Sequence, residues 1–327
     1  MNSSNHTGAK IPVLVLFAPT ATGKTALLRT LFAEGSLSFF KGKAEIVSAD
    51  SMQVYRGMNI GTAKPDSALL SVLPHHLIDI CSPREQFSVA DFVARADSAC
   101  AEIYSRGKIP VVAGGTGFYI RAFLLGLPET PDADENVRAE LRRRMEAEGP
   151  AELYAELRTL DPESAAVIHE HDRYRIQRAL EVYAATGRPR SSFRKRVGLR
   201  ERYAFCTLIL SMERKMLYER INQRVDGMFD EGLEQEVVRL RENGCTASDP
   251  GMKAIGYREW FSGCSAEGRS AGDVRGRIKA DSRAYAKKQY TYMRSIPSAE
   301  LLPFDGSEEA VLHAAEKIRD FFLLHLT

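Results

Sequence analysis

The chemistry open to this sequence is indicated first by a short loop of small residues that ends in a lysine and a threonine. The loop follows the apolar run Val13 to Phe17 and opens a helical stretch, which is the setting of a P-loop. Ala18 stands where the first glycine of a P-loop is usual. The residues are Ala18, Pro19, Thr20, Ala21, Thr22, Gly23, Lys24 and Thr25.

A loop of this kind binds an anion, because its backbone N–H groups and the helix N-terminus point at one spot. Lys24 can reach phosphate oxygens and the Thr25 hydroxyl can ligate Mg²⁺. The alternative is a chance match, which the preceding strand and the following helix disfavour. We therefore predict a phosphate or pyrophosphate site, and the loop alone leaves the ligand open.

A second chemical candidate is Asp50, which closely follows the β-rich run Ala44 to Ser48. A carboxylate there can bind Mg²⁺ through water or accept a proton from a nucleophile. The alternative is a helix cap or a turn residue, a frequent role of Asp. The polar segment that continues to Pro65, with two glycines, is more than a cap needs and favours a functional loop.

The elements that must position these residues alternate between strands and helices. Strands expected in this way are Val13 to Phe17, Ala44 to Ser48, Ile109 to Ala113 and Phe205 to Leu210. Helices are expected at Thr25 to Glu34, Val89 to Arg106, Arg214 to Asn243, Ala271 to Arg294 and Glu308 to Leu324. This alternation predicts an α/β fold with a P-loop-type parallel sheet flanked by helices. Ligands of such sheets bind at the carboxyl ends of the strands.

The middle of the chain has a different character, since residues 128–202 are rich in helical periodicity and poor in strand signals. We predict a helical insertion there. The P-loop catalytic core would comprise residues 11–127 together with 203–297, and residues 298–327 would form a C-terminal helical tail.

Positive charge gathers in this middle segment although the net charge is only +2. One cluster is Arg188, Arg190, Arg194, Lys195, Arg196, Arg200 and Arg202; the other is Arg138, Arg142, Arg143 and Arg144. Either cluster alone could be a solvated helix face. Both together favour a polyanionic partner.

Composition narrows the class further. Hydrophobic residues at 44% and charged residues at 27% are ordinary for a soluble globular protein, and no apolar run is long enough to span a membrane. Five cysteines without a CxxC pair indicate free thiols and a cytoplasmic location. The adjacent His75 and His76 would point to opposite faces of a strand, so we expect structural roles rather than a shared metal.

The motifs in order and spacing resemble the tRNA dimethylallyltransferase family from Val13 to Arg294. They are Ala18 to Thr25, Asp50 to Pro65, His75 to Asp79, Ser88 to Phe92, Gly114 to Tyr119, Asp161–Pro162, Ile168–His169, Arg175 to Val182, Lys253 to Arg258, and Tyr285 to Gln289 with Arg294. Departures from the family pattern are Ala18, Met52, Tyr174 and Tyr292, which concern packing or tRNA contacts more than the reaction centre.

The resemblance implies transfer of a dimethylallyl group from dimethylallyl diphosphate to N6 of adenosine 37 in the anticodon stem-loop of tRNA. The P-loop would hold the diphosphate, with Mg²⁺ at Thr25 and, through water, at Asp50. The catalytic residues implied are Asp50 as general base, Thr25, and Arg224 against the diphosphate. The protein would act as a monomer without an obligate protein partner.

The resemblance also implies that the helical insertion at 128–202 binds tRNA, and it implies a set of tRNA contacts. They are Asp50, Ser51, Met52, Gln53, Thr116, Arg138, Tyr174, Arg175, Ile176, Gln177, Arg178, Lys253, Ala254, Ile255, Gly256, Tyr257 and Arg258. Three other functions use parts of the same pattern: a P-loop small-molecule or nucleotide kinase, a prenyltransferase acting on free AMP, and a non-catalytic tRNA-binding protein. The kinase leaves the insertion and the later motifs unexplained. The long insertion argues against free AMP as acceptor, and the cradle with its carboxylate argues against a binding protein.

Overall fold

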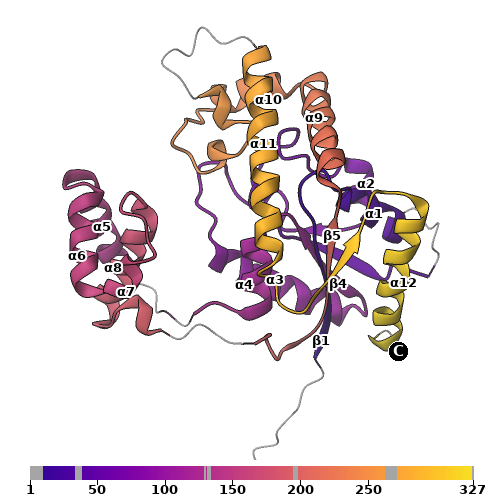
Figure 1. The fold of residues 1–327 in the computed structure, drawn as a ribbon, viewed down its shortest axis with the longest axis horizontal. Helices are drawn as coiled ribbons and strands as arrows, with labels where there is room; N and C mark the ends of the chain where they lie inside the picture. The colour runs from indigo at the N-terminus through magenta and orange to yellow at the C-terminus, as the bar shows by residue number, and fades with distance from the viewer. Residues whose placement is uncertain are drawn as a thin grey trace, which may run out of the picture. The chain divides into compact units, whose positions relative to one another are not determined.

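The computed structural model describes residues 10–33, 39–128, 130, 134–193, 198–261 and 271–325 (Figure 1). The chain divides into two compact units. The first comprises Met1–Leu124 and Leu199–Thr327, and the second is Leu125–Gly198. Among the described residues, no helix combines the length and the apolar character needed to cross a membrane.

The first unit is built on a six-stranded sheet in which every pair of neighbours is parallel. The strand order is β3-β2-β4-β1-β5-β6. The strands are β1 (Ile11–Phe17), β2 (Ala44–Ser48), β3 (His75–His76), β4 (Ile109–Gly114), β5 (Tyr203–Ser211) and β6 (Ala299–Pro303). β1, β2 and β4 are almost wholly buried, as expected of strands covered on both faces. The predicted fold class is confirmed.

The helices of this unit lie between these strands in the sequence or follow the last of them. They are α1 (Lys24–Leu28), the π-helix η1 (Arg29–Ala33), α2 (Ser67–Val72), α3 (Val89–Ser105), α4 (Gly117–Leu125), α9 (Arg214–Asp230), α10 (Leu233–Glu242), α11 (Ala271–Met293) and α12 (Glu308–His325), with 3-10 turns η3 (Gly251–Lys253) and η4 (Arg258–Trp260). α3 packs on β1, β2 and β4, whereas α1 and α12 belong to a cluster of buried side chains with the same strands.

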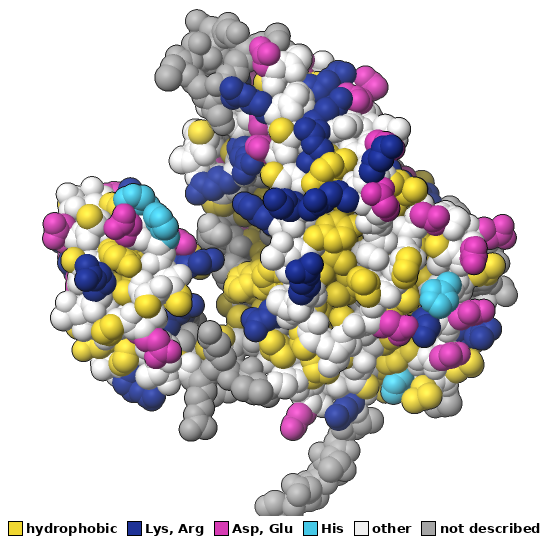
Figure 2. Space-filling model, viewed as in Figure 1, with side chains coloured by type: hydrophobic (Ala, Val, Ile, Leu, Met, Phe, Trp, Pro, Cys, Tyr) yellow, Lys and Arg dark blue, Asp and Glu magenta, His cyan; other side chains and the backbone are white. Residues whose placement is uncertain are grey.

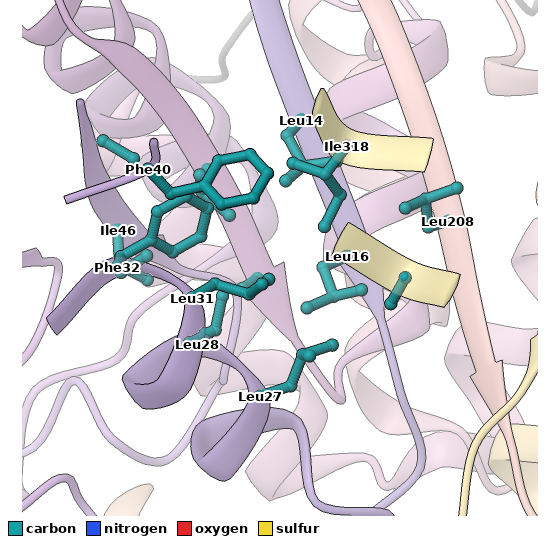
Figure 3. Packing of buried hydrophobic residues seen from close by; sticks show 14 of the residues in the cluster. Leu14, Leu16, Leu27, Leu28, Leu31, Phe32, Phe40, Ile46, Leu208 and Ile318 are labelled. Carbon is teal, nitrogen blue, oxygen red and sulfur yellow. The ribbon is translucent and has the colours of Figure 1, made fainter. Parts of the chain in front are cut away.

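The cluster that joins α1, η1 and α12 to the sheet is apolar and aromatic (Figure 3). Phe32 stacks on Phe322 at 5.8 Å between ring centroids, and Phe40 meets both rings edge-on. Leu14 and Leu16 of β1 belong to the same cluster and contribute to it from the sheet. The helix that follows the P-loop is therefore held by the last helix of the chain.

Two features of the first unit differ from the sequence-based expectation. Residues 298–327 are not a purely helical tail, because β6 extends the sheet beside β5 before α12 begins. The single helix expected from Arg214 to Asn243 is two helices, because Gly232 adopts φ 97°, a left-handed conformation that interrupts the helix.

The second unit consists of short helices with their own core. They are α5 (Glu135–Ala147), α6 (Pro150–Leu160), α7 (Pro162–Ala165), α8 (Arg173–Thr186) and the 3-10 turn η2 (Arg190–Ser192). Leu153, Leu157 and Ile176 lie at the centre of this core. The buried Asp161 accepts hydrogen bonds from Ser164 at the start of α7 and from Ser191 in η2, which ties these segments together. Arg194, Lys195 and Arg196 lie outside the described residues.

Glu45, in β2, is a buried carboxylate on the sheet. It bonds to His76 (2.8 Å), Arg106 (2.6 Å) and Lys108 (2.9 Å), while His75 bonds to the Leu73 carbonyl, so the two histidines have separate partners. Burial opposes ionisation of Glu45, but the hydrogen bonds from Arg106, His76 and Lys108 outweigh it and lower its pKa from 4.5 to about 2. Ionised Glu45 therefore stabilises the fold above about pH 4.5, and this contribution is lost as the pH falls towards 2.

We predict that Glu45→Gln lowers the free energy of unfolding at pH 7 by about 2 kcal/mol and flattens its decline between roughly pH 5 and pH 2. Urea unfolding across that pH range measures both effects. Glu102→Gln, an exposed carboxyl on α3, is the control and should keep the wild-type slope. An unchanged slope in Glu45→Gln would refute this account.

Candidate active site

The loop after β1 takes up the conformation of an anion cradle. Ala21 (φ 64°) and Gly23 (φ 103°) are left-handed, and the Thr22 hydroxyl donates to the Pro19 carbonyl at 2.8 Å. A Cβ on Gly23 would also lie 3.2 Å from the Phe304 ring. Ala18, by contrast, is not left-handed, so alanine is compatible with the position where a P-loop usually has glycine.

The backbone donors of this loop divide into two groups. The N–H groups of Ala18, Thr20 and Thr22 donate to the Gly114 carbonyl, Gln289 Oε1 and the Pro19 carbonyl. No described residue accepts a hydrogen bond from the N–H groups of Ala21, Gly23, Lys24 or Thr25. Such donors, left open at a helix start, form a nest for an anion. Of the loop residues expected to bind diphosphate, these four have backbone N–H groups open to an anion.

Two cations adjoin this nest. Lys24 is the first residue of α1, and no described residue pairs with its ammonium group. Arg224 comes from α9, and its Nη1 donates to the Thr20 hydroxyl at 3.3 Å. Burial lowers the pKa of both, Arg224 lowers that of Lys24 further, and Asp50 partly offsets each effect. Partly buried cations with so few partners favour an incoming anion.

Asp50 follows β2 and is partly buried. Its Oδ1 accepts from the backbone N–H groups of Met52 (2.9 Å) and Gln53 (3.4 Å), so the turn role considered for this residue is real. No described residue donates to Oδ2. The Ala18 and Ala49 N–H groups donate to the adjacent carbonyls of Gly114 and Ala113 at the end of β4, so the carboxylate and the cradle lie at the same edge of the sheet.

The end of β4 lies between the cradle and Asp50. Thr116 Oγ1 accepts from the Ser51 N–H at 3.0 Å, and the Thr116 N–H donates to the Ala49 carbonyl. A Cβ on Gly114 would fall 2.1 Å from that carbonyl, which only glycine avoids. Thr116 is therefore fixed to the loop that carries Asp50.

Gln289 of α11 is a site residue to which the sequence assigned no role. It is buried, its Oε1 accepts from the Thr20 N–H at 3.0 Å, and its Nε2 donates to the Gly115 carbonyl at 2.7 Å. Its amide thus joins the cradle to the turn before Thr116. The available signal was its place in the motif Tyr285 to Gln289.

The tRNA contacts expected from the sequence fall into exposed and buried groups. Lys253 and Arg258 are exposed in the first unit, and Tyr174 is 68% exposed in the second. Tyr257 and Ile176 are fully buried, so neither side chain is exposed on the surface of its unit. Gln53 is also buried. Its Oε1 accepts from the Ser48 hydroxyl, and its Nε2 donates to the carbonyls of Thr62 and Ala63.

Most of the remaining expected contacts are partly exposed, buried, or paired with an acidic side chain. Met52 and Ile255 are partly exposed and Ala254 and Gly256 are buried. Arg175 and Arg178 pair with Asp172 and Glu181, Gln177 also bonds to Glu181, and Arg138 lies near Glu135.

A basic surface along α11 was not recognised in the sequence. Figure 2 shows Lys and Arg side chains gathered over α11 and its neighbour α9. The basic residues of α11 are Arg275, Arg277, Lys279, Arg283, Lys287 and Lys288. Uncharged residues and Asp281 separate most of them along the chain, so the sequence holds no compact basic run there, although one helix carries all six.

The comparison with protein families decides the class of this site. Residues 53–296 match the family model described as IPP transferase. The chain belongs to this family. Curated relatives bear the matching name: "tRNA dimethylallyltransferase 2" of Geotalea uraniireducens is 46% identical over 284 residues, covering 86% of this chain and 89% of the relative. The tRNA dimethylallyltransferase of Geobacter sulfurreducens is 40% identical over 319 residues, covering 96% and 98%.

Solved structures agree with the family. The full-length tRNA isopentenylpyrophosphate transferase of Bacillus halodurans has a TM-score of 0.64 and 35% identity, covering 96% of this chain and 99% of that one. A eukaryotic dimethylallyltransferase acting on tRNA has a TM-score of 0.75 at 24% identity, covering 94% and 80%, and supports the fold alone. The chain is thus a prenyltransferase of the tRNA dimethylallyltransferase type.

We predict that inorganic pyrophosphate raises the melting temperature of the protein, because it would pair with the open N–H groups and both cations. At about one hundred times its Kd the gain in stability is about 2.7 kcal/mol. Lys24→Ala and Arg224→Ala should lose most of the shift in a thermal unfolding assay. Lys108→Ala, before β4 at the opposite end of the sheet, should keep it. An equal shift in all three variants would place the anion elsewhere.

Proposed function

We propose that this protein transfers the dimethylallyl group of dimethylallyl diphosphate to N6 of adenosine 37 in the anticodon loop of tRNA and releases diphosphate. One observation supports the proposal most directly. An open anion cradle with two cations and a carboxylate with one unengaged oxygen belong to one site. The name that the relatives bear specifies the donor class and the acceptor.

The cradle would act on the leaving group. When the allylic C–O bond breaks, negative charge grows on the diphosphate and the carbon becomes cation-like. The open N–H groups of Ala21, Gly23, Lys24 and Thr25, with the Lys24 ammonium and the Arg224 guanidinium, would bind the diphosphate. Preorganised donors of this kind stabilise developing charge without further rearrangement.

Asp50 would act on the nucleophile. An exocyclic adenine amine is weakly nucleophilic, and a carboxylate that accepts its proton as the new N–C bond forms lowers the barrier. Oδ1 is held by the turn, which leaves Oδ2 for the amine. Thr116, bound to the Asp50 loop through Ser51, would contact the adenine. Reaching that base requires it to leave the loop stack.

Mg²⁺ fits this site as a partner of the diphosphate. Among the described residues no group of three or more His, Cys, Asp or Glu side chains could hold a metal. The Thr25 hydroxyl and, through water, Asp50 would supply protein ligands, and diphosphate oxygens the rest, a common way to bind Mg²⁺. When bound, Mg²⁺ neutralises charge on the leaving diphosphate.

The tRNA would lie against the basic residues of α11 in the first unit, and the exposed Tyr174 and Arg175 of the second unit would add contacts. Contacts of Lys and Arg with phosphates provide affinity without reading sequence. We also propose that the second unit is the tRNA-binding insertion, that the protein acts as a monomer, and that it works in the cytoplasm, where its tRNA substrate is made.

The direct experiment is incubation of the protein with dimethylallyl diphosphate, Mg²⁺ and unmodified tRNA, followed by nucleoside mass analysis. Formation of dimethylallyl-adenosine is expected. AMP in place of tRNA tests transfer to a free nucleotide. ATP hydrolysis or phosphate transfer without tRNA would instead favour the kinase.

For the general base, we predict that Asp50→Asn lowers kcat by about 10² to 10⁴-fold while tRNA affinity changes little. Asparagine keeps an oxygen for the Met52 N–H and removes the proton acceptor, so the turn is preserved. Single-turnover kinetics and tRNA binding by filter retention provide the two measurements, and a retained pyrophosphate shift confirms an intact cradle. Wild-type turnover in this variant would remove Asp50 as base.

For tRNA binding, we predict that joint neutralisation of Arg194, Lys195 and Arg196 weakens affinity and reduces the slope of log K against log salt by about one per lost phosphate contact. These residues lie outside the described ones, so the prediction rests on the sequence. Replacing Lys317, Arg319 and Lys41 by Ala changes charge equally and is the control. The same slope for both triple variants would return the run to a solvated surface.

A further inference from the structure

Glu236 of α10 is a buried carboxylate without an assigned role. It is 2% exposed, and its two oxygens accept hydrogen bonds from the backbone N–H groups of Asn59 (2.9 Å), Ile60 (2.9 Å) and Gly61 (3.2 Å). The Tyr257 hydroxyl adds a fourth donor at 2.6 Å. Consecutive backbone donors that converge on one carboxylate hold that stretch of chain in a single conformation.

The same contact joins two glycine-containing segments that are far apart in sequence. A Cβ on Gly61 would lie 2.5 Å from the Tyr257 ring, so this ring is pressed directly against the backbone at 61. Gly256 is left-handed at φ 100°, and a Cβ there would lie 3.5 Å from Gly61 Cα. Because Gly61 and Gly256 have no side chains, the two segments can pack closely against each other.

From this contact a short series of hydrogen bonds leads to the general base. The amide nitrogen of Gln53 donates to the carbonyls of Thr62 and Ala63, directly after the stretch that Glu236 holds. The Gln53 backbone N–H donates to Asp50 Oδ1. Lys64, bonded to the Tyr55 carbonyl, Asn59 and Asp79, ties the other side of the loop.

We infer that Glu236, with Tyr257, is a positioning residue that holds the loop from Asp50 to Lys64 in the shape that receives the tRNA acceptor. This inference rests on the proposed function of the loop. The segment Lys253 to Arg258 would then act on tRNA in two ways: through exposed Lys253 and Arg258, and through the buried Tyr257, which braces a different loop.

The role requires an acceptor with a negative charge. Three N–H groups and one hydroxyl all point at the Glu236 oxygens, and a glutamine would turn an N–H₂ group towards some of these donors. The loop would then lose part of its brace while the cradle, which bonds to Gln289, Arg224 and the end of β4, keeps its contacts. The expected defect is therefore specific to the acceptor side.

Glu236→Gln tests this prediction. We expect KM for tRNA to rise roughly tenfold or more and kcat to fall, because loop and base are displaced. KM for dimethylallyl diphosphate and the rise in melting temperature caused by pyrophosphate should stay within about twofold of their wild-type values. Glu45→Gln is the matched control, because it neutralises a different buried carboxylate, in β2. It should lower stability without changing KM for tRNA.

Tyr257→Phe carries the same test should Glu236→Gln fail to fold. It removes one donor and keeps the ring against Gly61, so we expect KM for tRNA to rise about threefold with pyrophosphate binding unchanged. Unchanged KM for tRNA in the folded variants would overturn the inference. So would equal losses for tRNA and pyrophosphate, which would mark Glu236 as merely structural. Inactive wild-type protein would instead refute the proposed function.

Discussion

The structure depends on a local excess of positive potential at the carboxyl edge of a parallel sheet. Four backbone N–H groups from Ala21 to Thr25, the Lys24 ammonium and the Arg224 guanidinium meet there with few acceptors among the described residues. Such a concentration is unfavourable in the empty protein and becomes favourable when a polyanion arrives. The surrounding elements are arranged to hold it in place. Gln289 anchors the Thr20 backbone, and α9 and α11 pack on Ala21.

The strand order explains why the loop that carries Asp50 lies close to this positive potential. β4 lies between β1 and β2, so the loops after these two strands flank the turn that follows β4. That turn bonds to both: Gly114 accepts from Ala18, and Thr116 donates to Ala49. The two loops to which we assign the leaving group and the base are therefore joined through β4 by backbone hydrogen bonds rather than by flexible side chains.

Sequence reasoning recovered the parts of this arrangement that are encoded locally. β1 and β4 are apolar runs and β2 is interrupted only by Glu45; the cradle follows β1, and Asp50 follows β2. β6 was missed because it is short, mostly exposed and carries Glu300 and Pro303. The helix break was missed because only the left-handed φ of Gly232 reveals it.

The bridging residues could not be recovered from local pattern. Gln289 meets the Thr20 N–H across 269 positions, and Glu236 meets Asn59 across 177. A lone buried glutamine or glutamate in a helical segment carries no sign of its distant partner. The same limit explains why Tyr257 was expected to contact tRNA, since a motif does not distinguish a surface residue from one that supports the surface.

The late position of β6 and α12 has a consequence for synthesis. β1 pairs with β5, nearly two hundred residues further on, and the Phe322 ring that covers Phe32 is made later still. On a ribosome the first βα unit emerges with an uncovered apolar face, whereas the second unit, whose core is local, can already fold. The anion cradle, where Gly23 lies against Phe304, is therefore completed only after β6 is made, although its own residues are translated before β2.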